Sequence, residues 1–181
     1  MGDESGHSTR RFDLRDLGLL SAVPDRDFDI AVMLAAGALR TQMATFAVLD
    51  IEAGVARLRA HVGTKIPVTT LVTIPLETSL SIRAMSRTDV IAIPDTSRDP
   101  IARANPFILA QGVQSVLGAP VMCPASEVAA IIAVHDHVPR IWTTEEKQVI
   151  LGLAHFCTEL ILLRAALRTL GIVSRAGRAV G

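Results

Sequence analysis

Charged and polar residues gather in one stretch, 95–107, with the sequence DTSRDPIARANPF. Arg98 and Arg103 carry the planar guanidinium group that binds carboxylates and phosphates through paired hydrogen bonds. The same arginines could instead pair with Asp95 or Asp99 and order the segment, and we favour this interpretation. Asp95 follows a proline, and we expect its side chain to cap the next turn. Because polar connections of this length are usually functional or disordered, we predict that 95–107 forms the wall of a ligand pocket.

Three further polar residues lie in or beside segments predicted to be strands. Ser115 lies between apolar residues, and a buried hydroxyl there needs a partner from either the backbone or a ligand. His135 and His137 alternate around an aspartate, so on a strand both would face one side, as a metal-binding pair would. No third ligand stands at a suitable spacing, so we predict no metal site. No serine lies in a nucleophile-elbow motif, so we expect no catalytic triad.

The two cysteines, Cys123 and Cys157, form no CxxC pair. In a cytoplasmic protein such isolated thiols are more often buried small hydrophobic residues than partners in a disulfide. We therefore expect no catalytic residue of this type and no enzymatic activity.

Composition and charge limit the class of protein. The 181 residues suffice for one domain, and a content of 50% hydrophobic but only 3% aromatic residues predicts a core of Ala, Val, Ile and Leu. The longest uninterrupted apolar runs fall far short of the roughly 18 residues of a membrane span, and the polar N-terminus does not resemble a secretion signal. We expect a cytoplasmic protein that does not enter a membrane. A net charge of zero, no Tyr and one Trp argue against nucleic-acid binding.

The hydrophobic pattern predicts the elements. Apolar residues at helical spacing indicate a helix over 28–40, and segments 44–50 and 55–63 indicate a hairpin whose second strand has one wet face. Segment 64–75 is expected to be a loop. A short helix within 76–88 and a strand at 90–95 precede the long polar segment. Strands at 113–123 and 128–137 then form another hairpin, and Thr143 and Glu146 form a capping box that begins a helix ending near residue 170.

Strand pairs joined by tight turns exclude a doubly wound parallel sheet. They favour an α+β fold with a central antiparallel sheet, N- and C-terminal helices on one face and loops on the other. We expect a poorly ordered tail at 1–16, a single domain at 17–170 and a flexible basic tail at 171–181.

Three segments together resemble the GAF domain family. They are IPDTSRDPIARANPF at 93–107, VQSVLGAPV at 113–121 and VHDHVPRIWTTEE at 134–146. Each motif is weak alone, but their order and spacing are fairly specific, and the resemblance runs from about residue 17 to about residue 165.

The resemblance implies a pocket that a short helix and the long loop roof on one face of the sheet. Family members bind cyclic nucleotides, tetrapyrroles, small anions, amino-acid-like molecules or haem, so the ligand and any cofactor stay unknown. The ligand-binding residues expected on this basis are Ser81, Asp95, Arg98, Asp99, Arg103, Asn105, Ser115 and His135.

The resemblance also implies a regulatory role. Family members usually control an attached output domain, so we expect a separate signalling partner here, and a homodimer built by helices 28–40 and 144–170. Two alternatives remain: a ligand-free dimerisation module, and an enzyme like the free methionine-(R)-sulfoxide reductases of the family. Those members often carry Ser-Phe-Cys where this chain has Ser79, Leu80 and Ser81, so we expect no reductase activity.

Overall fold

The computed structural model describes residues 13–21, 23–67, 72–85 and 89–179, with side chains described as far as residue 170. Its elements, in which η marks a short 3-10 helix, follow in chain order. They are α1 (Arg26–Ala38), β1 (Met43–Asp50), β2 (Val55–Val62), β3 (Val72–Pro75), η1 (Leu76–Thr78), α2 (Ser81–Met85), β4 (Ile91–Ile93), η2 (Thr96–Arg98), η3 (Ala102–Ala104), α3 (Pro106–Gln111), β5 (Ser115–Met122), β6 (Val128–Asp136) and α4 (Thr144–Ala179).

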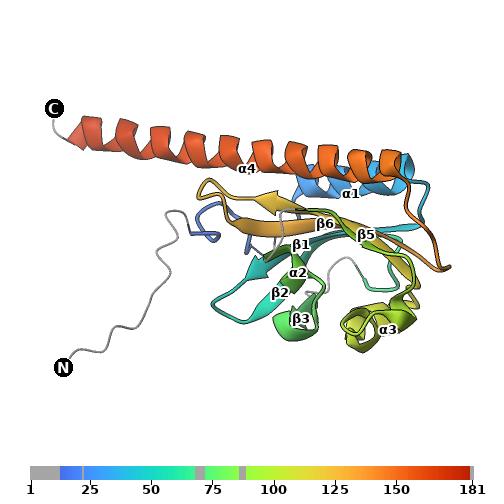
Figure 1. The fold of residues 1–181 in the computed structure, drawn as a ribbon. Coiled ribbons are helices and arrows are strands. Elements are labelled where there is room, and N and C mark those ends of the chain that lie inside the picture. Colours follow the sequence, from blue (N-terminus) through green and yellow to red (C-terminus); the bar gives the residue numbers. More distant parts are fainter. Residues whose placement is uncertain (1–12, 22, 68–71, 86–88, 180–181) are drawn as a thin grey trace, which may run out of the picture.

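The strands form one sheet in the order β3-β2-β1-β6-β5-β4, and every neighbouring pair is antiparallel. Helices α1 and α4 lie on one face of the sheet, while α2 and α3 lie on the other (Figure 1). This arrangement confirms the predicted α+β class and the predicted position of the terminal helices.

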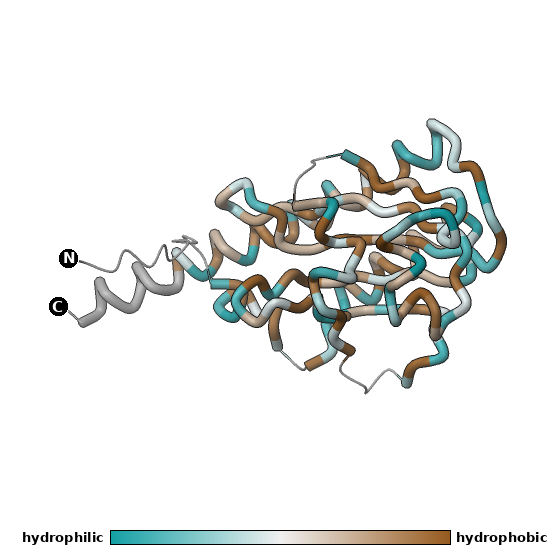
Figure 2. The backbone as a smooth tube through the Cα atoms, turned by 60° about the horizontal axis from the view of Figure 1, so that its bottom comes forward, coloured by the Kyte–Doolittle hydropathy of each residue, from teal (hydrophilic) through white to brown (hydrophobic). Residues whose placement is uncertain are grey.

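The period-two pattern of the central strands divides the core into two layers. Phe46, Leu117 and Ile132 belong to the cluster under α1 and α4, whereas Val116 and Ile131 belong to the cluster on the opposite face. Figure 2 shows hydrophobic residues along the central strands and hydrophilic ones in many of the turns around them. Both faces of β5 and β6 are therefore buried.

A bulge in β2 contradicts the predicted single wet face of segment 55–63. Phe46 pairs with Ala60 but the next residue, Ala47, pairs with Leu58, so Arg59 is an extra residue in the ladder. As a result Leu58 packs in the α2–α3 layer and Ala60 packs under α1 and α4. The extra residue places the side chains before and after it on opposite faces of the sheet. A regular alternation in the sequence does not show where such a bulge occurs.

Four other predictions about elements need correction. Part of segment 64–75, expected to be a loop, is the edge strand β3, and the long polar segment contains η2, η3 and the start of α3. Leu14, assigned to a poorly ordered tail, is buried in the core. Helix α4 continues to Ala179, past the predicted end, because a single internal glycine costs only about 1 kcal/mol and does not by itself end a helix.

The predicted capping box is present at the start of α4. The Thr143 N–H donates to Glu146 Oε2 at 2.8 Å, and the Glu146 N–H donates to Thr143 Oγ1 at 3.2 Å. Further along α4, Arg164 donates two hydrogen bonds to Asp25 at the start of α1, at 2.6 and 2.9 Å. Burial alone would raise the pKa of Asp25, but the hydrogen bonds and charge of Arg164 outweigh it and lower that pKa. The two helices are thus tied together on one face of the sheet.

Candidate functional site

The register of three central strands creates a hollow in the sheet. Thr45 on β1 pairs with Ala133 on β6, and Ala133 pairs with Gly118 on β5. These three neighbours face the α2–α3 layer with small side chains or none, between larger residues such as Ile131 and Ile91. A row of small residues across three strands leaves space that the elements above do not fill.

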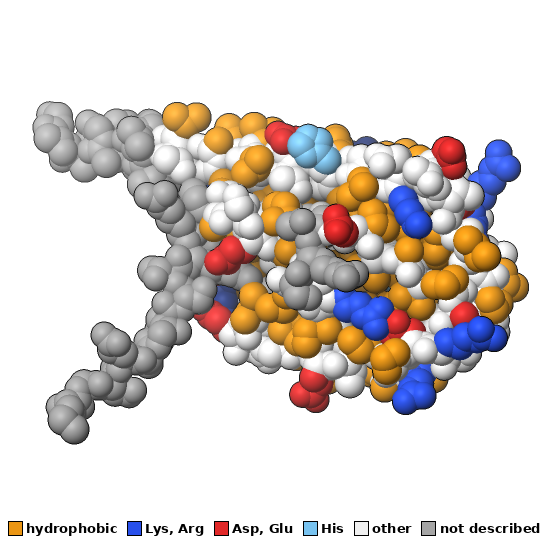
Figure 3. Space-filling model, viewed as in Figure 1, with side chains coloured by type: hydrophobic (Ala, Val, Ile, Leu, Met, Phe, Trp, Pro, Cys, Tyr) orange, Lys and Arg blue, Asp and Glu red, His pale blue; other side chains and the backbone are white. Residues whose placement is uncertain are grey.

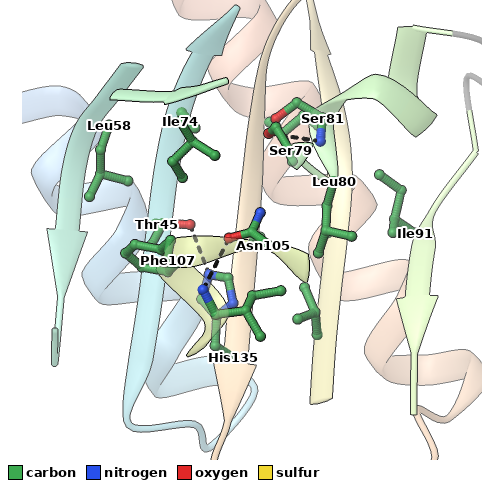
Figure 4. Close-up of a pocket in the computed structure, with 16 residues that line it drawn as sticks. Thr45, Leu58, Ile74, Ser79, Leu80, Ser81, Ile91, Asn105, Phe107 and His135 are labelled. Carbon is green, nitrogen blue, oxygen red and sulfur yellow. Dashed lines mark hydrogen bonds between the residues drawn. The ribbon is translucent and has the colours of Figure 1, made fainter. Parts of the chain in front are cut away.

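The roof of this hollow consists of residues 79–81, where α2 begins, and of α3 with its cap Asn105 (Figure 4). Asn105 caps α3, because its Oδ1 accepts from the Ile108 N–H at 3.0 Å, and its Nδ2 donates to the Thr78 carbonyl at 2.8 Å. Helix α3 then ends at Gly112, whose φ of 70° is a left-handed conformation that glycine adopts without strain. One buried amide side chain therefore joins the two halves of the roof.

Sheet and roof border a partly open cavity of about 60 Å³. This is several times the roughly 10–15 Å³ that one water molecule needs. The lining residues are Thr45, Ala47, Leu58, Ile74, Ser79, Leu80, Ser81, Ile91, Asn105, Phe107, Ile108, Val116, Gly118, Ile131, Ala133 and His135. Most are apolar, and among these described residues none carries a carboxylate, an ammonium or a guanidinium group.

His135 is the ionisable residue of the cavity wall. Its Nε2 shares a hydrogen bond of 2.9 Å with Thr45 Oγ1, and its ring is tilted against that of Phe107 (Figure 4). Nδ1 is buried and has no hydrogen-bond partner among the described residues. Burial, with a smaller contribution from the charge of His137, lowers the pKa of His135 to about 4. The imidazole is therefore neutral at physiological pH.

Three of the eight predicted ligand-binding residues line the cavity: Ser81, Asn105 and His135. Ser115 does not, because its position on β5 faces the other layer, where its hydroxyl donates to the Val138 carbonyl at 2.9 Å. The backbone is thus the partner of this buried hydroxyl. The interpretation of Ser115 as a ligand-binding residue is not supported.

The other four predicted residues, all in the polar segment, lie outside the cavity. Asp95 caps η2 by accepting from the Ser97 N–H at 3.0 Å, as expected, and pairs with Arg98 at 3.2 Å. Asp99 accepts from backbone N–H groups and binds Arg83 of α2 at 2.7 Å. Arg103 is exposed in η3. Only the end of the segment, from Asn105 on, forms the expected wall.

A second hollow lies at the surface beside β4. Asp95, Arg98 and Asp99 line it together with Pro94 and residues 139–141. It is open to solvent, and its charged side chains are already paired. Asp95 pairs with Arg98, and Asp99 pairs with Arg83. Arg140 pairs with Asp136 and Glu146. The cavity between sheet and roof is less open and mostly apolar, and it is therefore the better candidate for a binding site.

The cysteines lie away from the cavity. Cys123 and Cys157 are both buried in the cluster between the sheet and α1 and α4. Burial raises the pKa of Cys157 to about 12, so its thiol is protonated at neutral pH.

His135 and His137 do not form a metal-binding pair, because His137 Nδ1 bonds instead to the Gly112 carbonyl at 3.0 Å. No cluster of three metal-binding side chains occurs among the described residues.

Sequence reasoning missed most of the cavity wall. Thr45, Gly118 and Ala133 could have been found as small or polar residues at inward positions of apolar strands, once the register was known. Phe107 and Ile108 belong to a helix that the sequence analysis did not predict. Their proximity to the sheet depends on the fold of the preceding segment.

Comparison with known proteins settles the family. The GAF domain family model matches residues 24–161. The chain belongs to the GAF family. Members of this family are sensory and regulatory domains. A search of curated proteins gives no match.

Solved structures share the fold at low identity. The GAF domain of a phosphoenolpyruvate-protein phosphotransferase from Coxiella burnetii is 19% identical, with a TM-score of 0.66 over 88% of this chain and 94% of that one. The type II free methionine-R-sulfoxide reductase of Thermoplasma acidophilum is 22% identical, with a TM-score of 0.58 over 75% of this chain and 90% of that one. The free methionine-R-sulfoxide reductase of Neisseria meningitidis is 10% identical, with a TM-score of 0.65 over 84% and 87%. At this identity the likeness establishes the fold alone.

Proposed function

We propose that this GAF domain binds a small molecule in the cavity between its sheet and roof, and signals its presence to a separate partner through α1 and α4. The observation that carries the proposal is the cavity itself, with its mostly apolar lining. A concave, mostly apolar site with a few polar groups is the usual form of a small-molecule site. Loops and short helices form its roof, while the sheet supplies a rigid floor.

A chain of contacts connects the cavity to α4. The residue after His135, Asp136, accepts from Arg140 at 3.2 Å. Arg140 also binds Glu146 in the first turn of α4 and donates to the Leu39 carbonyl after α1 at 3.1 Å. A displacement of β6 by a ligand at His135 would therefore act on the start of α4 and the end of α1 together.

A homodimer is the second part of the proposal. Helix α4 carries an outward apolar seam at alternating spacings of four and three residues, the heptad pattern of a coiled coil. The seam residues are Val149, Leu153, Phe156, Leu160, Leu163, Leu167 and Leu170. Figure 3 shows hydrophobic side chains along α4. The side chains of Leu163, Leu167 and Leu170 are 57%, 58% and 65% exposed. A second copy of the chain, joined by a two-fold axis, would cover this seam.

The apolar length of α4 does not require a membrane. Thr144–Leu170 is long and apolar enough to cross a bilayer by length and composition. However, Ile150, Cys157 and Ile161 on its inner side are buried against the sheet, in the same core as α1. This packing supports a cytoplasmic protein in which α4 is a core and dimer helix.

We also propose that the protein is not a sulfoxide reductase, although two structural neighbours are. That chemistry needs an attacking thiolate and a second thiol beside the substrate. Here Ser79 and Ser81 line the cavity, and both cysteines lie on the other side of the sheet. Thioredoxin-coupled turnover of free methionine sulfoxide that disappears in Cys123→Ser or Cys157→Ser would contradict this.

Native mass spectrometry of the protein purified from its own cytoplasm tests the binding function. We expect a co-purifying small molecule with the wild type. It should be absent from Ala133→Leu, which fills the floor of the cavity, and retained by Ala92→Leu, a matched change at an exposed position of β4. Purification without any bound molecule from both the wild type and Ala92→Leu would favour the ligand-free dimerisation module, which the apolar lining also suits.

A further inference from the structure

The described walls of the cavity carry no fixed charge. None of the described lining residues has a carboxylate, ammonium or guanidinium group. Two arginines outside this lining are paired with carboxylates: Arg83 of α2 forms an ion pair with Asp99, and Arg98 of η2 forms one with Asp95. A charged group in the cavity would therefore meet no fixed charge of opposite sign on the described lining residues.

The polar atoms of the wall are also neutral, and several are already used. Both ends of the Asn105 amide bond to the backbone of the roof. Thr45 and His135 bond to each other, and burial lowers the pKa of His135 to about 4, so the imidazole supplies no positive charge at neutral pH. Ser79 Oγ accepts from the Ser81 N–H at 3.2 Å. What remains for a ligand is a small number of neutral hydrogen-bonding groups.

These features determine which ligands the cavity excludes. A phosphate, carboxylate or ammonium group loses its hydration on entering an apolar site, and only a paired charge or several directed hydrogen bonds recover that cost. Neither is present on the described walls. An apolar ligand, by contrast, gains free energy from burial against Leu58, Ile74 and Ile91.

We propose that the cavity is selective for small, uncharged, mainly apolar molecules with at most a single neutral hydrogen-bonding group. The proposal rests on the function proposed above and names the chemical class of its ligand. Nucleotides, amino acids and inorganic anions fall outside this class.

A matched series of probes tests this selectivity. Cyclohexanol, cyclohexanecarboxylate and cyclohexylamine share one ring and differ in charge at pH 7. Binding is followed by the NMR signals of methyl-labelled isoleucines, because Ile74, Ile91 and Ile131 line the cavity and Ile161 in the opposite core serves as internal control. We expect cyclohexanol to shift the cavity methyls, and both charged probes to bind at least a hundredfold more weakly.

The variants Ala133→Leu and Ala92→Leu locate the binding. Shifts caused by cyclohexanol should vanish in Ala133→Leu and persist in Ala92→Leu. Cavity shifts with the carboxylate or the amine at concentrations similar to those for cyclohexanol would overturn the proposed selectivity and leave the binding function intact. Failure of all three probes to shift the cavity methyls, or cyclohexanol shifts that persist in Ala133→Leu, would overturn both.

Discussion

The pair formed by His135 and Thr45 is the main polar feature of an apolar wall. The His135 ring is buried, bonds through one nitrogen and leaves the other without a partner among the described residues. A buried polar atom without a partner costs roughly 1–3 kcal/mol. A residue that lowers stability in this way is easier to understand at a binding site than in a core built only for packing.

The stability of the protein should fall as the pH is lowered from 7 to 5. The pKa of His135 is about 4 in the folded protein and near 6.5 in the unfolded chain. The unfolded state therefore takes up a proton first, and the stabilisation present above pH 6.5 is lost as the pH falls toward 4. The expected loss between pH 7 and 5 is about 2 kcal/mol.

Urea denaturation of wild type and His135→Leu at both pH values measures this contribution. The variant should lose about 2 kcal/mol less than the wild type over this interval. Part of the dependence should remain in both proteins, because burial also lowers the pKa of His61. Equal pH dependence in the two proteins would show that burial does not lower the pKa of His135.

The sequence analysis predicted the chemical roles of single residues better than the face of the fold on which their side chains lie. The capping role of Asp95 and its pairing with Arg98 follow from local chemistry, and both are confirmed. The faces occupied by Ser115 and Arg103 depend on strand register and on the path of η3. Neither is encoded in the few residues around them.

At the scale of elements, Arg140 is the joint between β6, α1 and α4. It binds Asp136 and Glu146, donates to the Leu39 carbonyl and lies over the ring of Trp142 at 4.5 Å. Its backbone N–H also donates to the Pro94 carbonyl at 2.9 Å, after β4. A single residue therefore connects the ends of several elements at one end of the sheet.

Replacing Arg140 should lower the stability of the protein even when the positive charge is kept. We expect Arg140→Lys to lower the free energy of unfolding by roughly 2 kcal/mol, because an ammonium group cannot reproduce the directions of the guanidinium hydrogen bonds. The matched control is Arg98→Lys, whose side chain is 87% exposed and whose ion pair should contribute less than about 1 kcal/mol. Equal effects in chemical denaturation would contradict the role given to Arg140.

The roof should become less mobile when the cavity is occupied. We expect ligand binding to slow backbone hydrogen exchange in 95–107, most of all from Asn105 on, relative to the β1–β2 hairpin around Gly54. Hydrogen-exchange mass spectrometry at saturating ligand measures both regions at once. Equal protection in the two regions would argue against a roof that closes over the ligand.

Sequence patterns identified the long elements and, among the short ones, α2 and β4, but they missed β3 and α3. The hairpins β1–β2 and β5–β6 and both terminal helices have enough residues for a clear period. Strand β3 has four residues beside a proline, and α3 has six behind an Asn-Pro cap, so neither shows a period of its own. Because Phe107 and Ile108 belong to α3 and Ile74 belongs to β3, these parts of the cavity wall were the least predictable.

At the scale of the whole molecule, the exposed seam of α4 predicts self-association. It extends over 22 residues, from Val149 to Leu170, or about 33 Å at ~1.5 Å per residue. We expect the wild type to sediment as a dimer at micromolar concentration. Leu163→Glu with Leu167→Glu should make it monomeric while it stays folded, because both side chains are already exposed in one copy.

The matched control changes the polar side of the same helix. His155→Glu with Thr169→Glu adds the same number of carboxylates at exposed positions outside the seam, so this variant should remain dimeric. Circular dichroism of both double variants verifies that the fold is kept. A monomeric wild type, or a folded seam variant that stays dimeric, would exclude the proposed interface.

The order of layers has a consequence for how two bound ligands influence each other. Each cavity lies on the side of the sheet away from α4 (Figure 1). In a dimer joined by α4, the two ligands would be separated by both sheets and both helix layers, and neither could touch the other. Any cooperativity between the sites must therefore pass through the helices. The monomeric variant, Leu163→Glu with Leu167→Glu, should then bind ligand with a Hill coefficient of one, even if the wild-type dimer binds it with a different Hill coefficient.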